Sequence, residues 1–287
     1  MHPVLFELPW GGTANAYGTL ILVGAVATFP GFWWDAKRRG IGGTQLLSFF
    51  VDFYLAAALG AFLGGRLLHV LTVPSEYLAN PMRVLVSDGT GFVFFGSLAA
   101  IVGAWAWVAR RHGTTLSTVC DLAATWFALA HAFGRLGCLF AGCCWGAPTD
   151  ADFGVSFGPE SVVALVDGAP FDPAHGDHTV ALVPIQAIEA GGLFLIAAGL
   201  ALVRIRRGPE APWLAASRYA IGYGLLRFVT DAMRGDTTRG FVFELPGGAL
   251  AEIFGMARGQ PMLLSVSQLV AVGLVIAGIA GLRRNRS

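Results

Sequence analysis

Charged residues are scarce in this sequence. Of its 287 residues, 13% are charged and 55% are hydrophobic, and the mean hydropathy is +0.64. A soluble domain usually carries about a quarter charged residues, so this composition excludes an ordinary soluble domain. The formal net charge of +1 says nothing further about partners, and no nucleic-acid-binding module can be recognised.

Signals for processing and for repeat architecture are missing as well. The first apolar segment lacks a basic stretch before it and a small-residue cleavage site after it, so we expect no cleavable signal peptide. The sequence shows no convincing internal repeat and no low-complexity tail. We therefore predict a single integral membrane domain over residues 1–287.

Long apolar runs dominate what the sequence does contain. A helix of about 20 apolar residues spans the hydrocarbon layer of roughly 30 Å. The runs lie at residues 17–36, 46–71, 91–109, 118–140, 181–203, 213–233 and 262–282. They predict an all-α, polytopic membrane protein with a bundle of seven transmembrane helices.

Basic residues lie on one side of the predicted membrane. They follow the first, third, fifth and seventh runs, at residues 37–39, 110–111, 204–207 and 283–286. The segment at about 141–180 has neither lysine nor arginine. Because cytoplasmic loops are enriched in basic residues, we predict an outside N-terminus, a cytoplasmic C-terminus and an outward-facing loop at about 141–180.

Polar residues inside the runs gather near the outer surface under this topology. They are Tyr17, Arg66, Arg135, Gln186, Glu189 and Arg227. Helical spacing places several on shared faces: Tyr219, Tyr223, Arg227, Asp231 and Arg234 on one helix, and His131, Arg135 and Cys138 on another. Polar faces on apolar helices normally point into the bundle or a water-filled cavity.

These arginines predict a binding site for a phospholipid head group. Arginine presents a planar fork that matches phosphate oxygens, and two or three of them at headgroup depth favour this chemistry. The alternative is a set of structural ion pairs, such as Arg227 with Asp231, that hold the bundle together.

Three cysteines, Cys138, Cys143 and Cys144, lie close together in the segment 131–146. One thiol, such as Cys143, activated by Arg135 or His131, would act as a nucleophile or acyl carrier. Alternatively, His131 and the cysteines would bind a metal such as zinc, although the spacing does not match a usual zinc pair. In a third interpretation two of them form a disulfide or simply pack. We expect no resident metal or cofactor.

Several motifs in this order resemble the prolipoprotein diacylglyceryl transferases of bacterial membranes. The matching pieces are Tyr17-Gly18, Gly64-Gly65-Arg66, the segment 91–96, Gly134-Arg135-Leu136-Gly137 with Gly142 and Gly146, Pro184-Ile185-Gln186 with Glu189, and Arg227-Phe228 with Asp231 and Arg234. The family fold is a seven-helix membrane bundle.

The resemblance implies transfer of a diacylglyceryl group from phosphatidylglycerol to the thiol of a prolipoprotein at the outer leaflet of the bacterial inner membrane. Arg135 and Arg227 would hold the phosphate, as preplaced cations do for a developing charge. Tyr17, Gln186 and Glu189 would shape the lipid pocket, and Asp231 and Arg234 would orient Arg227. The predicted substrate site also includes Arg66, Tyr223, Cys138 and Cys144. The expected partners are phosphatidylglycerol, the signal-peptide and lipobox region of the prolipoprotein, and membrane lipids.

The sequence also departs from the family pattern. Cys138, Ala141 and Cys143 stand where the family carries asparagines and a glutamate, and Phe95 stands where many members have histidine or tyrosine. Phenylalanine cannot accept a proton, so His131 is the candidate general base. Two other functions remain open: a paralogue that uses its own cysteines for lipid carriage or redox chemistry, and a non-enzymatic lipid-binding membrane protein.

Overall fold

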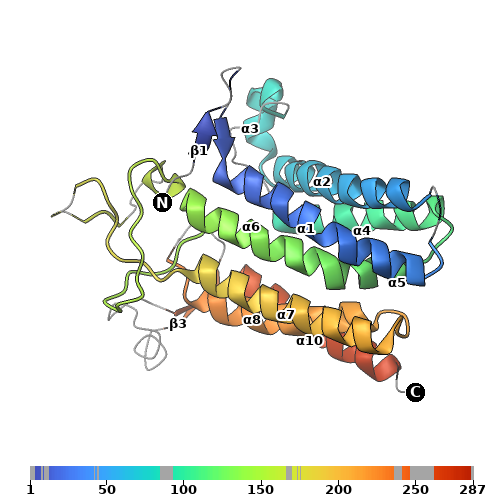
Figure 1. The fold of residues 1–287 in the computed structure, drawn as a ribbon. Helices are drawn as coiled ribbons and strands as arrows, with labels where there is room; N and C mark the ends of the chain where they lie inside the picture. The colour runs from blue at the N-terminus through green and yellow to red at the C-terminus, as the bar shows by residue number, and fades with distance from the viewer. Residues whose placement is uncertain are drawn as a thin grey trace. The chain divides into compact units, whose positions relative to one another are not determined.

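Helices form most of the chain (Figure 1). In the computed structural model the described residues are 4–7, 9, 13–41, 43, 45–84, 93–165, 170–172, 174, 176–235, 241–245 and 262–285. The chain divides into two units, Phe29–Ala123 on the one hand and Met1–Thr28 with Ala124–Ser287 on the other. Helices suit an apolar solvent because they satisfy their own backbone N–H and C=O groups.

The unit Phe29–Ala123 is built on the packed helices α2 (Gln45–Thr72) and α4 (Phe94–Arg111). Glycines bring the two backbones together, since a Cβ on Gly96 would lie 2.1 Å from the carbonyl oxygen of Gly64. Small residues at such contacts are typical of membrane bundles. The unit also holds the end of α1 (Ala16–Arg38), α3 (Pro74–Ala79), the 3-10 turn Pro81–Val84 and α5 (Leu116–Leu122).

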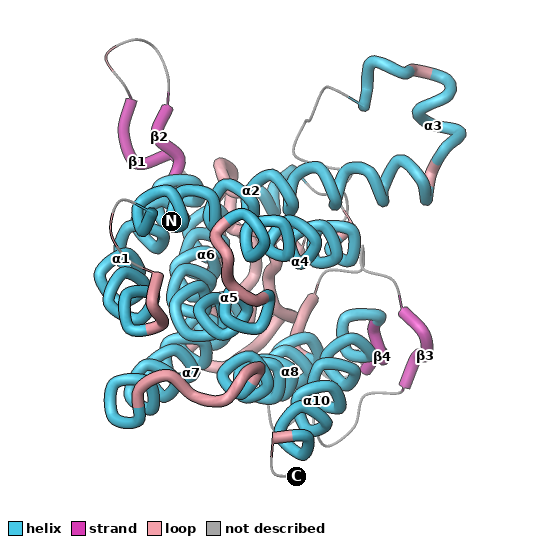
Figure 2. The backbone as a smooth tube through the Cα atoms, turned by 90° about the vertical axis from the view of Figure 1, so that its right-hand side faces the viewer, coloured by secondary structure: helices cyan, strands magenta, loops and turns pink. Residues whose placement is uncertain are grey.

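The other unit contains α6 (Ala128–Ala141), α7 (Ile185–Arg207), α8 (Leu214–Ala232) and α10 (Val266–Arg284). Helix α6 packs on α7, α7 on α8, and α8 on α10, an arrangement that Figure 2 shows end-on. Helix α10 begins at a capping box between Ser265 and Gln268, in which each side chain accepts a hydrogen bond from the other's backbone N–H. Because Gln268 Nε2 also donates to the carbonyl oxygen of Phe228 at 3.2 Å, this capping box is joined to α8.

Backbone hydrogen bonds tie the segment after α6 to the ends of α7 and α8. Gly146 N–H donates to the carbonyl oxygen of Val183 at 3.1 Å, and Ala147 N–H to that of Met233 at 2.8 Å. A side chain at Gly146 has no room, because its Cβ would lie 2.2 Å from the Val183 oxygen. The cysteine-bearing segment is therefore held beside the polar ends of α7 and α8.

The prediction of a mostly helical protein with several membrane-spanning helices is confirmed. Among the described residues, five helical segments are long and apolar enough to cross a membrane, namely Ala16–Arg38, Gln45–Thr72, Leu116–Ala141, Ile185–Arg207 and Val266–Arg284. The apolar runs at 91–109 and 213–233 form α4 and α8. The total of seven spans, the outside N-terminus and the single-domain organisation stay predictions.

The structure corrects the predicted helix boundaries and adds short strands. The run at 262–282 begins in strand β4 (Met262–Ser265), paired with β3 (Phe241–Leu245), and the helix starts only after the Ser265 cap. A second hairpin joins β1 (Val4–Glu7) to β2 (Thr13–Asn15). The run at 181–203 becomes helical only at Ile185, because Pro184 occupies the N-cap. Apolarity alone predicted these runs, and it does not distinguish a strand from the first turn of a helix.

Candidate functional site

A buried carboxylate, Glu189 on α7, joins two arginines from the neighbouring helices. Its Oε1 lies 3.1 Å from Nη2 of Arg135 on α6, and its Oε2 lies 3.3 Å from Nη1 of Arg227 on α8. The Glu189 side chain is 1% exposed, whereas the Arg135 and Arg227 side chains are 14% and 12% exposed. The carboxylate thus lies beneath two cations that remain partly accessible.

A second buried carboxylate, Asp231, holds Arg227 from its own helix. Asp231 Oδ1 lies 2.9 Å from Arg227 Nη2, and Asp231 Oδ2 accepts a hydrogen bond from the Ser265 hydroxyl. The orientation of Arg227 is therefore coupled to the cap of α10. The sequence prediction missed Ser265, although the Ser-x-x-Gln pattern at residues 265–268 is a recognisable capping signal.

His131 lies against the two tyrosines of α8. Its Nδ1 is 3.1 Å from the Tyr219 hydroxyl, and its ring meets the Tyr223 ring edge-on at a centroid distance of 5.1 Å. Tyr219 and Tyr223 are themselves stacked, with 7° between their planes. Because Nδ1 is engaged, only Nε2 could accept a proton from a substrate, and it does so only when Nδ1 carries the hydrogen of the neutral ring.

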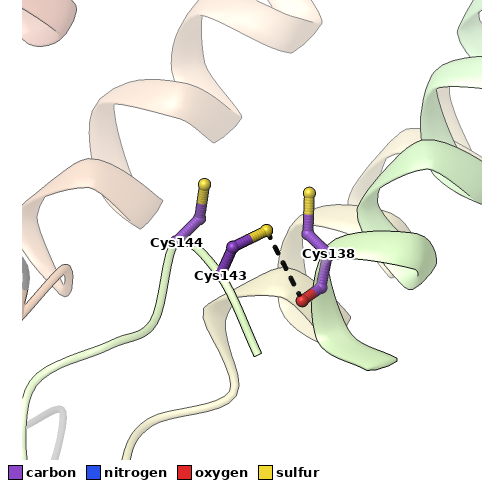
Figure 3. A group of neighbouring side chains, drawn as sticks. All are labelled: Cys138, Cys143 and Cys144. Atoms are coloured by element: carbon purple, nitrogen blue, oxygen red, sulfur yellow. Dashed lines mark hydrogen bonds between the residues drawn. The ribbon is translucent and has the colours of Figure 1, made fainter. Parts of the chain in front are cut away.

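The end of α6 gathers the three cysteines into one cluster. Gly142 adopts a φ of +70°, and Cys143 N–H donates to the carbonyl oxygen of Cys138 at 3.1 Å, as in a Schellman cap. Cys144 also adopts a left-handed conformation, with a φ of +58°. As a result the Sγ atoms of Cys138, Cys143 and Cys144 all lie within 4.8 Å of one another (Figure 3).

Hydrogen bonds among these thiols distribute their protons unequally. Hydrogen bonds from Cys138 and Cys143, helped by the positive charges of Arg234 and Arg135, lower the pKa of Cys144 well below its usual range. The corresponding hydrogen bonds raise the pKa of Cys143. Cys144 therefore loses its proton more readily than Cys143, the thiol that we singled out from the sequence as a nucleophile.

Gln186 links α7 to the cysteine segment. Its side chain is completely buried, and Nε2 donates to the carbonyl oxygen of Cys143 at 2.8 Å. Its Oε1 is buried and has no hydrogen-bond partner among the residues that the structure describes. A buried acceptor without a partner costs free energy, and a substrate donor would relieve that cost.

Tyr17 lies beside the same part of α6. A Cβ on Gly137, between Arg135 and Cys138, would lie 3.1 Å from the Tyr17 Cα, so the backbones touch. The Tyr17 residue is 44% exposed. Tyr17 is therefore placed to contact a ligand that reaches this face of α6.

The roles predicted for Arg66 and Arg234 stay predictions. Arg66 belongs to the unit Phe29–Ala123, where its guanidinium lies 5.4 Å from the centre of the Tyr77 ring. Phe95 lies in α4, but its side chain is outside the described residues. Arg234 follows α8 and pairs with Gly146 in a backbone bridge, so an orienting effect of Arg234 on Arg227 stays a prediction.

A separate pocket of about 420 Å³ lies on the segment between α6 and α7. Its lining includes Asp150 and Asp172, alongside Pro148, Thr149, Ala151, Val180 and Ala181. Two carboxylates would repel an anionic head group. The arginine cluster is therefore the better candidate site.

The chain is similar to known proteins over almost its whole length. A family model described as prolipoprotein diacylglyceryl transferase matches residues 3–284. A phosphatidylglycerol–prolipoprotein diacylglyceryl transferase of Clostridium tetani is 29% identical over 280 residues, which cover 97% of this chain and 96% of that protein. The protein of the same name from Polynucleobacter asymbioticus is 30% identical over 235 residues, covering 82% of this chain and 77% of its own.

Proposed function

This chain belongs to the prolipoprotein diacylglyceryl transferase family and is a transferase, and from its arginine cluster we propose the reaction that it catalyses. It transfers the diacylglyceryl group of phosphatidylglycerol to the cysteine thiol of a prolipoprotein. The reaction takes place at the outer leaflet of the bacterial cytoplasmic membrane. Both substrates are those in the names of the relatives from Clostridium tetani and Polynucleobacter asymbioticus.

The observation that carries this proposal is the pairing of two partly exposed arginines over buried carboxylates. Glu189 and Asp231 together neutralise the two guanidinium charges and hold their orientation. A guanidinium has five N–H donors, and these ion pairs use only Nη2 of Arg135 and both Nη atoms of Arg227. The accessible edges of both groups then face the phosphate of the lipid.

The chemistry is a displacement at the glyceryl carbon that carries the phosphate ester. The acceptor sulfur forms a C–S bond as the C–O bond breaks, and glycerol phosphate leaves with its additional negative charge. Arg135 and Arg227 stabilise that charge because they are already in position and need no reorganisation. His131, through Nε2, accepts the proton of the acceptor thiol.

Gln186 and Tyr17 would complete the recognition of the head group. The buried Gln186 Oε1 accepts a hydrogen bond from a hydroxyl of the glycerol head group. This contact satisfies the one buried acceptor of the site that lacks a partner among the described residues. The lipobox region of the prolipoprotein brings its cysteine to the same face of α6.

Purified full-length protein, vesicles of phosphatidylglycerol and a lipobox peptide test the proposal through release of glycerol phosphate. Arg135→Lys and Arg227→Lys keep the positive charge but lose the planar guanidinium that can bind two phosphate oxygens at once. Loss of such a hydrogen bond to a charged group typically costs about 1.5–3 kcal/mol, so we expect turnover to fall about tenfold to a hundredfold. Arg218→Lys is the matched control, because Arg218 lies on α8 but pairs with Glu210. Near-normal turnover in both site variants would show that the arginines are structural.

A second candidate function is favoured by the cysteine cluster, namely that the protein carries the lipid group on one of its own thiols. This function predicts a covalent lipid adduct on Cys143 or Cys144, detectable by mass spectrometry of the intact protein, that disappears on substitution by serine. If no glycerol phosphate is released under any condition, phosphatidylglycerol is not the donor in either candidate function.

A further inference from the structure

Three thiols that the predicted reaction does not require converge at the end of α6. Their sulfur atoms lie within 4.8 Å of one another, and they come from one helical residue and two consecutive loop residues. We propose that Cys138, Cys143 and Cys144 bind a zinc ion whose fourth position takes up the acceptor thiol. This inference rests on the proposed function, since it supplies that reaction with its activated sulfur.

The distances suit such a site. Zinc binds thiolate sulfur at about 2.3 Å in tetrahedral geometry, which requires sulfur atoms about 3.8 Å apart. The sulfur atoms lie within 4.8 Å of one another, and rotation of the cysteine side chains can shorten these distances to the value that zinc requires. Thiolates are soft ligands and select zinc or monovalent copper over magnesium or calcium.

The backbone explains how two adjacent cysteines reach one ion. In an extended segment, consecutive side chains point to opposite sides, which is why adjacent cysteines rarely share a metal. Here Cys144 adopts a φ of +58°, a conformation that is uncommon for a residue other than glycine. This turn, two residues after the left-handed Gly142, brings the sulfur atoms of Cys143 and Cys144 close to that of Cys138 (Figure 3). The spacing of the cysteines along the sequence, from which we expected no resident metal, does not show that the fold brings their three sulfur atoms together.

Three protein ligands leave one position open. Among the residues that the structure describes, no histidine or carboxylate joins the three sulfurs in this group. Structural zinc sites usually have four protein ligands, whereas catalytic sites have three and an exchangeable position. An open position is where an external thiol can bind.

The neighbours of the cluster fit this role. Cys138 lies one turn from Arg135 on α6, and Gln186 bonds the Cys143 carbonyl oxygen, so the thiols adjoin the phosphate site. Arg234 and Arg135 both act electrostatically on Cys144. Their positive charges offset part of the negative charge of four thiolates around a divalent ion.

The chemical step balances without an oxidant or reductant. The acceptor thiol binds the zinc ion, and its proton passes to His131, which shares a face of α6 with Cys138. A thiol that coordinates zinc is deprotonated, so the bound sulfur is a thiolate at neutral pH. This thiolate attacks the glyceryl carbon, forming the C–S bond as the C–O bond to phosphate breaks. The thioether then leaves the metal, and the open position is restored.

The test uses reduced, full-length protein in detergent, stripped of metal with a chelator and titrated with Co²⁺ as a coloured substitute for Zn²⁺. We expect thiolate-to-cobalt charge-transfer absorption that saturates at one ion per chain and is lost on addition of Zn²⁺. Cys138→Ser, Cys143→Ser and Cys144→Ser should each weaken binding at least tenfold. Cys120→Ser, the remaining cysteine and a residue of α5, should bind as the wild type does.

A second measurement avoids variants that fail to fold. In the wild-type protein, Zn²⁺ should slow the alkylation of Cys138, Cys143 and Cys144. The rate at which Cys120, the fourth cysteine, is alkylated should be the same with and without Zn²⁺. The proposal is overturned if no charge-transfer absorption appears, or if Zn²⁺ protects no cysteine after full reduction.

The activity measurement separates this inference from the proposed function. Metal removal should abolish release of glycerol phosphate, and Zn²⁺ should restore it in the wild type and in Cys120→Ser. Full activity of the stripped protein would overturn the thiol-activating role. Arg227→Lys should bind Co²⁺ normally while losing turnover. Metal binding can therefore be measured even in a protein that does not catalyse the transferase reaction.

Discussion

Glu189→Gln is the most informative single change in the arginine cluster. Glutamine has nearly the shape of glutamate, so the substitution leaves no cavity. It removes the negative charge shared by Arg135 and Arg227, which lie 3.1 and 3.3 Å from its oxygens. It also turns an amide N–H₂ group toward one of the two guanidinium groups, which have no lone pair to accept its hydrogens.

The expected magnitude follows from the burial of these groups. Removing one partner of a buried ion pair costs about 3–5 kcal/mol, because the other charge is left uncompensated. The Arg135 and Arg227 side chains are 14% and 12% exposed, so solvent stabilises part of the charge that the substitution leaves unpaired. We therefore expect the free energy of unfolding to fall by about 3 kcal/mol, at the lower end of this range.

Two measurements check this expectation. Unfolding in mixed detergent micelles should show the stability loss, and glycerol phosphate release should fall at least a hundredfold as the arginines separate. Glu210→Gln is the control, because it breaks an ion pair outside the arginine cluster in which Arg218 is 29% and Glu210 10% exposed. Solvent reaches Arg218 more than it reaches Arg135 or Arg227, so we expect a smaller loss of stability and no loss of turnover. If Glu189→Gln unfolds and turns over like the wild type, the cluster does not depend on this carboxylate.

Three further predictions address the base, the cysteine segment and the topology. His131→Ala should lower turnover by about 10²–10⁴-fold and flatten the acid limb of the pH–rate profile, as expected for a lost general base; an unchanged profile would exclude this role. Gly146→Ala should impair both folding and turnover, because its Cβ would lie 2.2 Å from a carbonyl oxygen, while Gly191→Ala, which meets nothing within 4 Å, should be neutral in a thermal unfolding assay. A reporter fused after Ser287 should be active only in the cytoplasm, and activity on the outer side would contradict the predicted orientation.

The sequence by itself determined the broad class of the protein. The small number of charged residues and the long apolar runs predicted membrane-spanning helices. The order of the sequence motifs indicated the family, which the comparisons confirm. Helical periodicity also placed Arg227 and Asp231 on one face of a single helix, where the structure pairs them at 2.9 Å. Such predictions succeed because residues four apart on a helix are neighbours whatever surrounds it.

Only the tertiary structure decided which groups from different helices meet. Sequence periodicity does not show that Glu189 lies between Arg135 and Arg227, because that depends on how α6, α7 and α8 pack. It also does not show that Ser265 reaches Asp231 from the start of α10. The convergence of the three sulfurs depends on two left-handed residues, Gly142 and Cys144, after α6. Spacing along the chain measures neither helix packing nor the direction of a turn, so these contacts follow from the folded backbone alone.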